Sequence, residues 1–227
     1  MVYCYIIFQE DPQMSDFTNT FNEISELLQK GKAKEIVGVV EKALSDGAAA
    51  ADILEKGLIS GMNIIGGKFK QGEIFVPEVL IAARAMNRAS AVLKPALAEA
   101  GVEAVGKAII CTVKGDLHDI GKNLVKMMIE GKGIEVLDLG VDCDSEKIIE
   151  TVQSSNARVV CLSALLTTTM TAQREVIDAL KTAGIRDKVK VMVGGAPVTQ
   201  SFAEEIGADA YTPDAATAAE VCRAFYN

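Results

Sequence analysis

The second half of the chain alternates short apolar runs with amphipathic helical stretches. The apolar runs cover residues 107–113, 134–140, 158–164, 190–195 and 209–212. Helical patterns cover residues 120–130 and begin again near Ser145, Thr169, Thr199 and Asp214. Continuous apolar runs of this length are typical of strands buried on both faces of a parallel sheet. The alternation therefore predicts an α/β fold with a Rossmann-like (flavodoxin-like), doubly wound, five-stranded parallel sheet over residues 107–227.

The first half shows a different pattern, in which apolar residues recur at intervals of three and four. Four such stretches follow one another, separated by Gly31, Gly47, the Gly66-Gly67 pair and Pro95. Four short helices of this kind form a small bundle. We therefore expect a helical-bundle domain over residues 14–96 and a linker over residues 97–106. Residues 1–13 differ in character and are assigned as an N-terminal extension.

Charge and cysteine usage exclude several classes of partner. The chain carries 31 acidic and 23 basic residues, and its net charge of −8 would repel a phosphate backbone, so we expect no nucleic acid. The apolar run at residues 2–8 falls far short of the roughly 20 residues that cross a bilayer, so we expect no membrane association. Five scattered cysteines without a CxxC pair indicate a reducing, cytoplasmic location.

The chain contains a single histidine, His118, in the loop that follows the first expected strand. Binding crevices of doubly wound sheets lie at the carboxyl ends of the strands. Asp116 is two positions earlier, so both side chains can project to the same side of an extended loop, where the carboxylate can hold the Nδ1 proton. Nε2 is then free as a ligand or a base. The alternative is that His118 only caps the next helix.

Two later loops carry small or hydroxyl-bearing residues. Ser163, Thr167 and Thr169 follow the third expected strand, where hydroxyl groups can donate to a ligand or, alternatively, only cap a helix. Gly194 and Gly195 follow the fourth strand and allow close approach to the backbone, although a tight turn alone also explains them.

Other crevice chemistries do not match these loops. Residues 115–121, GDLHDIG, lack the central glycine of a dinucleotide fingerprint and the spacing of a P-loop. Ser163 stands where a receiver domain needs an aspartate. One histidine with scattered cysteines does not supply the ligands of a zinc site.

Taken together, the three loop motifs resemble the signature of cobalamin-binding domains that bind the cofactor base-off, with a protein histidine on cobalt. The motifs are Asp116-x-His118-x-x-Gly121, Ser163-x-Leu165 and Gly194-Gly195. Residues 61–89, GMNIIGGKFKQGEIFVPEVLIAARAMNRA, are similar to the cap of corrinoid methyltransferases. The resemblance implies a corrinoid protein of methylamine, methanol or methoxyarene methyltransferase systems, similar also to the cobalamin-binding module of cobalamin-dependent methionine synthase.

The resemblance implies roles for individual residues. His118 would be the lower axial ligand to cobalt, Asp116 would accept its other proton, and Thr169 would replace the serine that commonly completes this relay. The threonine keeps the hydroxyl group but has fewer rotamers. The remaining assignments are Gly121, Ser163, Leu165, Thr167, Gly194 and Gly195 around the nucleotide tail, and Phe69 and Val76 over the upper face of the corrin. Ordinary helix packing is the alternative for Phe69 and Val76.

The resemblance also implies a cobalamin or related corrinoid cofactor, whose cobalt cycles between Co(I) and methyl-Co(III). A substrate:corrinoid methyltransferase would load the methyl group, and a methylcorrinoid:coenzyme M or tetrahydrofolate methyltransferase would remove it. A reductive activator would repair oxidised cobalt. The chain would be a carrier subunit rather than a complete enzyme, with residues 97–106 as the hinge of a mobile cap.

Two alternative functions share the cobalamin signature. One is the cobalamin subunit of a mutase, against which the helical first half argues, because a mutase needs a substrate barrel. The other is a cobalamin-dependent sensor or regulatory protein. A sensor that reads DNA would need a basic helix, and residues 1–95 contain no clustered Lys/Arg face. Signalling through protein contacts stays open.

Overall fold

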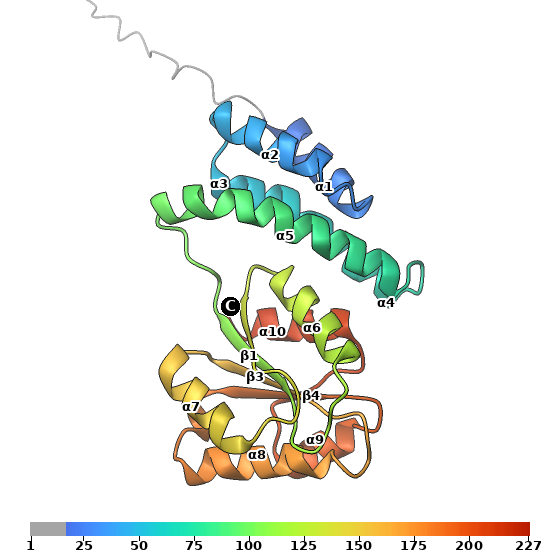
Figure 1. The fold of residues 1–227 in the computed structure, drawn as a ribbon, viewed down its shortest axis with the longest axis vertical. Coiled ribbons are helices and arrows are strands. Elements are labelled where there is room, and N and C mark those ends of the chain that lie inside the picture. The colour runs from blue at the N-terminus through green and yellow to red at the C-terminus, as the bar shows by residue number, and fades with distance from the viewer. Residues whose placement is uncertain (1–16) are drawn as a thin grey trace, which may run out of the picture.

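A computed structural model describes residues 17–227, so the assigned extension at residues 1–13 lies outside the described part (Figure 1). The first half is helical, as predicted. Its elements are α1 (Thr18–Gln29), α2 (Glu35–Ser45), α3 (Ala50–Asp52), η1 (Ile53–Ile59), α4 (Ser60–Lys70) and α5 (Val76–Glu99). The elements α3, η1 and α4 follow one another without a break, and η1 is π-helical. Counted as continuous helical runs, these elements match the four predicted helices.

The bundle is held together by a close approach of α1 to η1. Ile24 and Leu28 on α1 are fully buried. A Cβ atom at Gly57 in η1 would lie 2.9 Å from Cγ2 of Ile24, closer than non-bonded carbon atoms pack. Glycine at this position therefore lets the two helices come into contact.

Helix α5 is longer than the sequence predicts, because it continues through Pro95 to Glu99. Proline removes one backbone N–H group and so leaves one carbonyl of the preceding turn without its helical partner. The residues after it, Ala96 to Glu99, are strong helix formers. Ala96 and Leu97 also pack against the buried core. This packing helps to offset the cost of the proline, and the non-helical part of the predicted linker is correspondingly shorter.

The second half is the predicted doubly wound parallel sheet. Its strands are β1 (Lys107–Thr112), β2 (Glu135–Asp138), β3 (Val159–Ser163), β4 (Lys190–Gly194) and β5 (Ala210–Tyr211). All neighbouring pairs are parallel, and the order is β2-β1-β3-β4-β5. The order reverses between β1 and β3, so the carboxyl ends of these two strands form the topological switch point, where ligands bind in such folds.

Helices cover both faces of the sheet. They are α6 (Ile120–Glu130), α7 (Ser145–Ser155), α8 (Thr171–Thr182), α9 (Gln200–Ile206) and α10 (Ala215–Ala224), with a 3-10 turn η2 at Arg186–Lys188. Figure 1 shows α6 and α10 on the face turned toward the bundle, and α7, α8 and α9 on the other. Thr199 and Asp214 cap α9 and α10 with their side chains, as their positions predict. Helix α8 begins at Thr171 rather than near Thr169.

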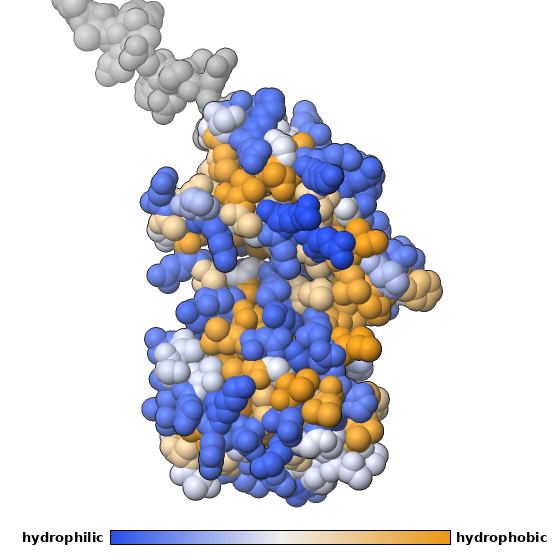
Figure 2. Space-filling view, in the orientation of Figure 1, coloured by the Kyte–Doolittle hydropathy of each residue, from blue (hydrophilic) through white to orange (hydrophobic). Residues whose placement is uncertain are grey.

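The bundle and the sheet share one apolar core. A single cluster of buried side chains runs from Leu93 of α5 through Met62 of α4 and Met128 of α6 to Ile110 of β1. Figure 2 shows apolar surface on the right-hand side of the view, where the two halves meet. Within residues 17–227, no helix is long and apolar enough to cross a membrane.

Because Ile110 belongs to this shared core and is 1% exposed, Ile110→Ala should destabilise the protein. We expect the free energy of unfolding to fall by about 2–5 kcal/mol, measured by urea denaturation. Ile64→Ala is the matched control, since Ile64 is 41% exposed, and should change it by about 0.5 kcal/mol or less. Equal effects of the two substitutions would contradict this description of the core.

Candidate functional site

The carboxylate of Asp116 is hydrogen-bonded to both the loop that follows β1 and the loop that follows β3. Its Oδ1 atom accepts hydrogen bonds from the His118 backbone N–H (3.0 Å) and lies 2.7 Å from His118 Nδ1. Its Oδ2 atom accepts from the Leu165 backbone N–H and from Thr169 Oγ1, both at 2.7 Å. Three sequence-predicted residues, Asp116, His118 and Thr169, are therefore in direct contact, and Leu165 joins them through its backbone.

Asp116 is ionised although it is only 1% exposed. Burial raises the pKa of this carboxyl, but the hydrogen bonds from Thr169, Leu165 and His118 outweigh burial and hold the pKa well below its usual range. An ionised carboxylate accepts hydrogen bonds and donates none. The proton between Asp116 and His118 is therefore on Nδ1 of the imidazole.

With Nδ1 occupied by Asp116, Nε2 is the ring nitrogen of His118 that is left for another partner. Its side chain is 53% exposed, whereas that of Asp116 is fully buried. Among the described residues, Nδ1 has Asp116 as its partner and Nε2 has none. The ring is thus held at Nδ1 by Asp116 and is accessible at Nε2. Metal-binding histidines with a carboxylate partner have this arrangement.

A cavity of about 390 Å³ lies beside this loop, between the ends of β3 and β4 and the helices α6 and α10. Five of the sequence-predicted residues line it: Phe69, Gly121, Ser163, Gly194 and Gly195. A Cβ atom at Gly121 would meet nothing within 4 Å, so this position faces open space. The Ser163 hydroxyl makes no hydrogen bond with any residue in the described range. These features leave room and a free polar group for an elongated ligand.

Gly195 has a structural reason to be glycine as well. Its φ angle is +128°, and a Cβ atom there would lie 1.8 Å from the carbonyl oxygen of Ala164. A side chain is therefore excluded by the approach of the β3 loop. The close packing of the two loops also shapes the wall of the cavity.

Six sequence-predicted residues do not line this cavity: Asp116, His118 and Thr169, and also Val76, Leu165 and Thr167. Thr167 is exposed in the β3–α8 loop. Val76, at the start of α5, is half-buried and packs against the shared core. Phe69 packs against the same core while it lines the cavity, so helix packing accounts for both apolar residues of the bundle in this structure.

The surface next to His118 is apolar and exposed. Leu117 and Ile120 are 71% and 80% exposed, and Leu165 and Leu166, from the loop that bonds Asp116, are 41% and 44% exposed. Large apolar side chains gathered on a surface mark a binding site. The His118 imidazole therefore lies beside an exposed apolar surface that suits a flat, largely apolar ligand.

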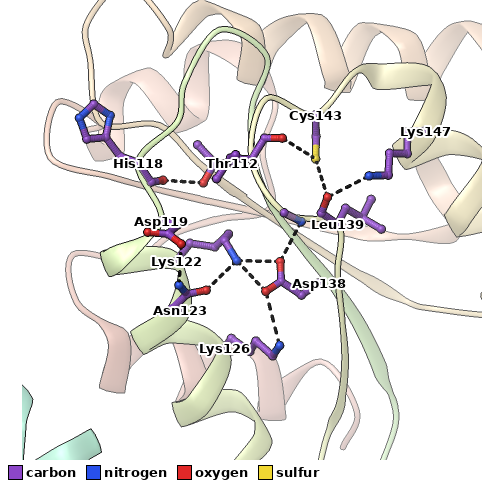
Figure 3. Close-up of polar contacts among 12 residues, drawn as sticks. Thr112, His118, Asp119, Lys122, Asn123, Lys126, Asp138, Leu139, Cys143 and Lys147 are labelled. Carbon is purple, nitrogen blue, oxygen red and sulfur yellow. Dashed lines mark hydrogen bonds and ion pairs between the residues drawn. The ribbon is translucent and has the colours of Figure 1, made fainter.

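A buried ion pair at the start of α6 was not predicted from the sequence. Lys122 is 3% exposed, and its Nζ atom donates to both oxygens of Asp138 at 2.7 Å and to Asn123 Oδ1 at 2.8 Å. Figure 3 shows the pair beneath the loop, with the His118 ring directed away from it. The available signal was Asp138, a charge inside the apolar run of the second strand. Its position at the end of that strand places it near the first turn of α6, which contains Lys122.

The fold and the site together define a flavodoxin-like protein with an exposed histidine at its switch point and a cavity beside the same loop. Comparison with known proteins agrees with this class. Two family models, each described as a B12 binding domain, match residues 106–222 and residues 20–94.

Several relatives match along most of their length. The dimethylamine corrinoid protein of Methanosarcina barkeri is 44% identical over 197 residues, which are 86% of this chain and 92% of the relative. A solved cobalamin-binding protein from Desulfitobacterium hafniense DCB-2 is 34% identical with a TM-score of 0.76, covering 90% of this chain and 98% of that one. The methanol:cobalamin methyltransferase complex MtaBC from Methanosarcina barkeri matches at 30% identity with a TM-score of 0.83, covering 92% of this chain and 80% of that one.

The chain therefore belongs to the B12-binding corrinoid proteins, and its cofactor is a cobalamin or related corrinoid. The residues present suit such a group. The single histidine offers a ring nitrogen with a carboxylate behind the opposite nitrogen, and the exposed leucines and Ile120 provide an apolar surface beside it. The cavity lined by Gly121, Ser163 and Gly194 has space for a side arm of the cofactor.

The Lys122–Asp138 pair should stabilise the fold in a pH-dependent way. Burial raises the pKa of Asp138, but the hydrogen bonds that it accepts from Lys122 and Gly140 lower the pKa by more than burial raises it. The pKa in the native protein therefore lies below its usual range. The contribution of the ion pair to the free energy of unfolding is therefore complete above the usual carboxyl pKa of about 4. It is lost as the pH falls through the pKa of Asp138 in the native protein. We expect Lys122→Met to cost about 3 kcal/mol of unfolding free energy at pH 7, and less below about pH 4, measured by urea denaturation.

Lys126→Met is the control, because Lys126 Nζ lies 3.4 Å from the same carboxylate but is more exposed. Its cost should stay below about 1 kcal/mol. A Lys122→Met effect as small as this, or one that does not shrink in acid, would contradict the assignment.

Proposed function

We propose that this chain is a methyl carrier that binds its corrinoid base-off, with His118 Nε2 as the lower axial ligand to cobalt. The observation that carries the proposal is the buried, ionised Asp116 behind an imidazole whose Nε2 is open. The bound corrinoid supplies the chemistry, since cobalt as Co(I) accepts a methyl group and as methyl-Co(III) gives it up. The chain binds, orients and shields this group, and separate proteins perform the two transfers.

Asp116 and Thr169 set the basicity of the ligand. The carboxylate keeps the proton on Nδ1, which raises electron density at Nε2. The Thr169 hydroxyl donates to the other oxygen of the Asp116 carboxylate at 2.7 Å. This hydrogen bond withdraws electron density from the carboxylate and so limits the electron density that the carboxylate donates to the imidazole. The threonine occupies the rotamer that makes this bond, so the hydroxyl relay proposed from the sequence is sterically possible.

The nucleotide tail of the cofactor is proposed to lie in the cavity between the sheet and helices α6 and α10. Ser163 offers a free hydroxyl on the wall, and Gly121, Gly194 and Gly195 keep the passage clear of side chains. Leu165 and Thr167 lie outside the cavity in the next loop, so contacts from them would be made at its rim.

The bundle is proposed to be a movable domain that covers the upper face of the corrin. Leu97 to Glu99 belong to α5, which narrows the proposed hinge to residues 102–106. Glu103 and Ala104 are exposed and make no hydrogen bond within the described part of the chain. Phe69 and Val76 lie on either side of the α4–α5 turn, where a shift of the bundle would bring them toward the corrin.

The partners proposed for the carrier follow from its family. A substrate:corrinoid methyltransferase would load methyl groups from a methylamine, methanol or a methoxyarene, and a second methyltransferase would pass them to coenzyme M or tetrahydrofolate. A reductive activator would return oxidised cobalt to the active state. The four cysteines in residues 17–227 are free thiols, which agrees with a reducing cytoplasm as the place of action.

The carrier function can be tested with reduced, corrinoid-loaded protein and purified substrate methyltransferases. We expect the absorbance spectrum to change to that of a methylated corrinoid with one enzyme and its methyl donor, under anaerobic conditions. His118→Ala should bind cobalamin at least tenfold more weakly, or about 1.4 kcal/mol, because the axial bond is lost. Asp119→Ala, a neighbouring exposed carboxylate, is the control and should bind normally. Isolation of the native protein with light-sensitive adenosylcobalamin would instead favour the mutase or sensor function.

The position of the nucleotide tail can be tested by filling the cavity. Gly121→Leu puts a side chain into open space, so the protein should fold, yet cobalamin should bind at least tenfold more weakly. Cobinamide, which lacks the nucleotide, should bind as it does to the unmodified chain, measured by absorbance titration. Gly38→Leu is the matched control, because Gly38 lies on helix α2 with nothing within 4 Å. Equal loss for the two corrinoids would contradict this placement of the tail.

A further inference from the structure

Thr112 is a buried residue at the point where β1 ends and the His118 loop begins. It is fully buried, and each of its three polar groups has a different partner. Its N–H donates to the Gly140 carbonyl at 3.0 Å, and its carbonyl accepts from the Cys143 N–H at 3.1 Å. Its Oγ1 donates to the carbonyl of His118 at 2.8 Å, as Figure 3 shows. Thr112 therefore connects the end of β1, the β2–α7 loop and the backbone of His118.

The His118 carbonyl has no other hydrogen-bond partner among the described residues. Helix α6 begins two residues later, and its first hydrogen bond at this end runs from Asn123 N–H to the Asp119 carbonyl at 2.7 Å. The N–H of Lys122, which would be the helical partner of the His118 carbonyl, does not donate to it. The Thr112 hydroxyl is therefore what satisfies it.

His118 is thus held at both of its peptide groups and at its ring. Asp116 accepts from the backbone N–H and contacts the ring, while Thr112 donates to the carbonyl. Removing the second contact would leave the peptide that follows His118 free to rotate. The ring would keep its contact with the Asp116 carboxylate, but its distance from the end of β1 would no longer be fixed.

The β2–α7 loop completes this support. Asp142 has a φ angle of 51°, its N–H donates to the Asp116 carbonyl at 3.0 Å, and its Oδ1 accepts from Gly115 N–H at 2.7 Å. A non-glycine residue in this conformation persists only where neighbouring contacts fix it. The two backbone bonds of Thr112 to Gly140 and Cys143, on either side of Asp142, supply contacts of this kind.

We propose that Thr112 is a positioning residue for the axial ligand, acting through the backbone of His118. Because it is fully buried, it would act on the cofactor only through His118. The inference rests on the proposed ligation of cobalt by His118 and adds the hydroxyl that fixes where Nε2 lies. Groups that orient a metal-binding histidine typically change metal affinity by about 10-fold to 100-fold when removed.

The test compares four chains loaded with cobalamin and reduced to the Co(II) state. Thr112→Val keeps the shape but lacks the hydroxyl, whereas Thr112→Ser keeps the hydroxyl but lacks the methyl group. Thr182→Val is the control, because it removes a hydroxyl that donates to a backbone carbonyl (Asp178, 2.9 Å) on the exposed surface of α8. The measurements are cobalamin affinity and the electron paramagnetic resonance spectrum of protein whose histidine carries the heavy nitrogen isotope. A doublet splitting then reports the imidazole of His118 on cobalt, whereas a triplet reports the cofactor's own base.

We expect Thr112→Val to bind cobalamin at least about tenfold more weakly and to lose most of the nitrogen splitting. Thr112→Ser and Thr182→Val should bind within about twofold of the unmodified chain and keep the splitting. If Thr112→Val does not fold, Thr112→Ala replaces it, since Thr112→Ala and Thr112→Ser differ by one oxygen atom. Normal binding and splitting in the hydroxyl-free variant would overturn the inference, as would an equal loss in Thr112→Ser.

The failure of this inference differs from the failure of the proposed function. If the unmodified holoprotein shows no histidine nitrogen on cobalt, the ligation is wrong and the role of Thr112 falls with it. If the unmodified holoprotein shows the splitting and the loss of the hydroxyl does not alter it, only the role of Thr112 is overturned.

Discussion

The site depends on one buried negative charge, the carboxylate of Asp116. A buried carboxylate is costly unless several donors surround it. Here the donors come from the His118 loop, from the backbone of Leu165 and from Thr169, so the charge ties the ends of β1 and β3 together. The same contacts keep the carboxylate ionised and so fix the proton on Nδ1 of His118. One interaction therefore shapes the loops and sets the chemistry of the histidine.

The sheet topology makes this interaction possible. Because the strand order reverses between β1 and β3, their carboxyl ends are neighbours while their following helices leave to opposite faces, α6 to one and α8 to the other. The cavity lined by Gly121, Ser163 and Gly194 lies at the same edge of the sheet. The bundle packs on α6 and α10 and adds Phe69 to the same cavity. Its position is therefore coupled to the space in which we place the nucleotide tail.

The sequence predicted the fold and the polar centre of the site because both depend on local patterns. Alternating apolar runs indicated the sheet, and the spacing of Asp116 and His118 placed two side chains on one side of a loop. Lys122 and Thr112 were missed for a physical reason. A lysine in a first helical turn and a threonine ending a strand are ordinary there, and their importance comes from partners 16 and 6 residues away that only the folded chain brings close. Helix α5 continues past Pro95 because Ala96 and Leu97 pack against the core, which the local pattern did not show.

The presence of one histidine in the chain allows a direct test of the central claim, that His118 Nε2 ligates cobalt. The protein would be produced with histidine labelled by the heavy nitrogen isotope, loaded with unlabelled cobalamin and reduced to Co(II). Electron paramagnetic resonance then identifies the ligand, because ordinary nitrogen splits each cobalt line into a triplet and the heavy isotope splits it into a doublet. The account predicts doublets. Triplets, which would come from the cofactor's own base, or the absence of splitting would contradict it.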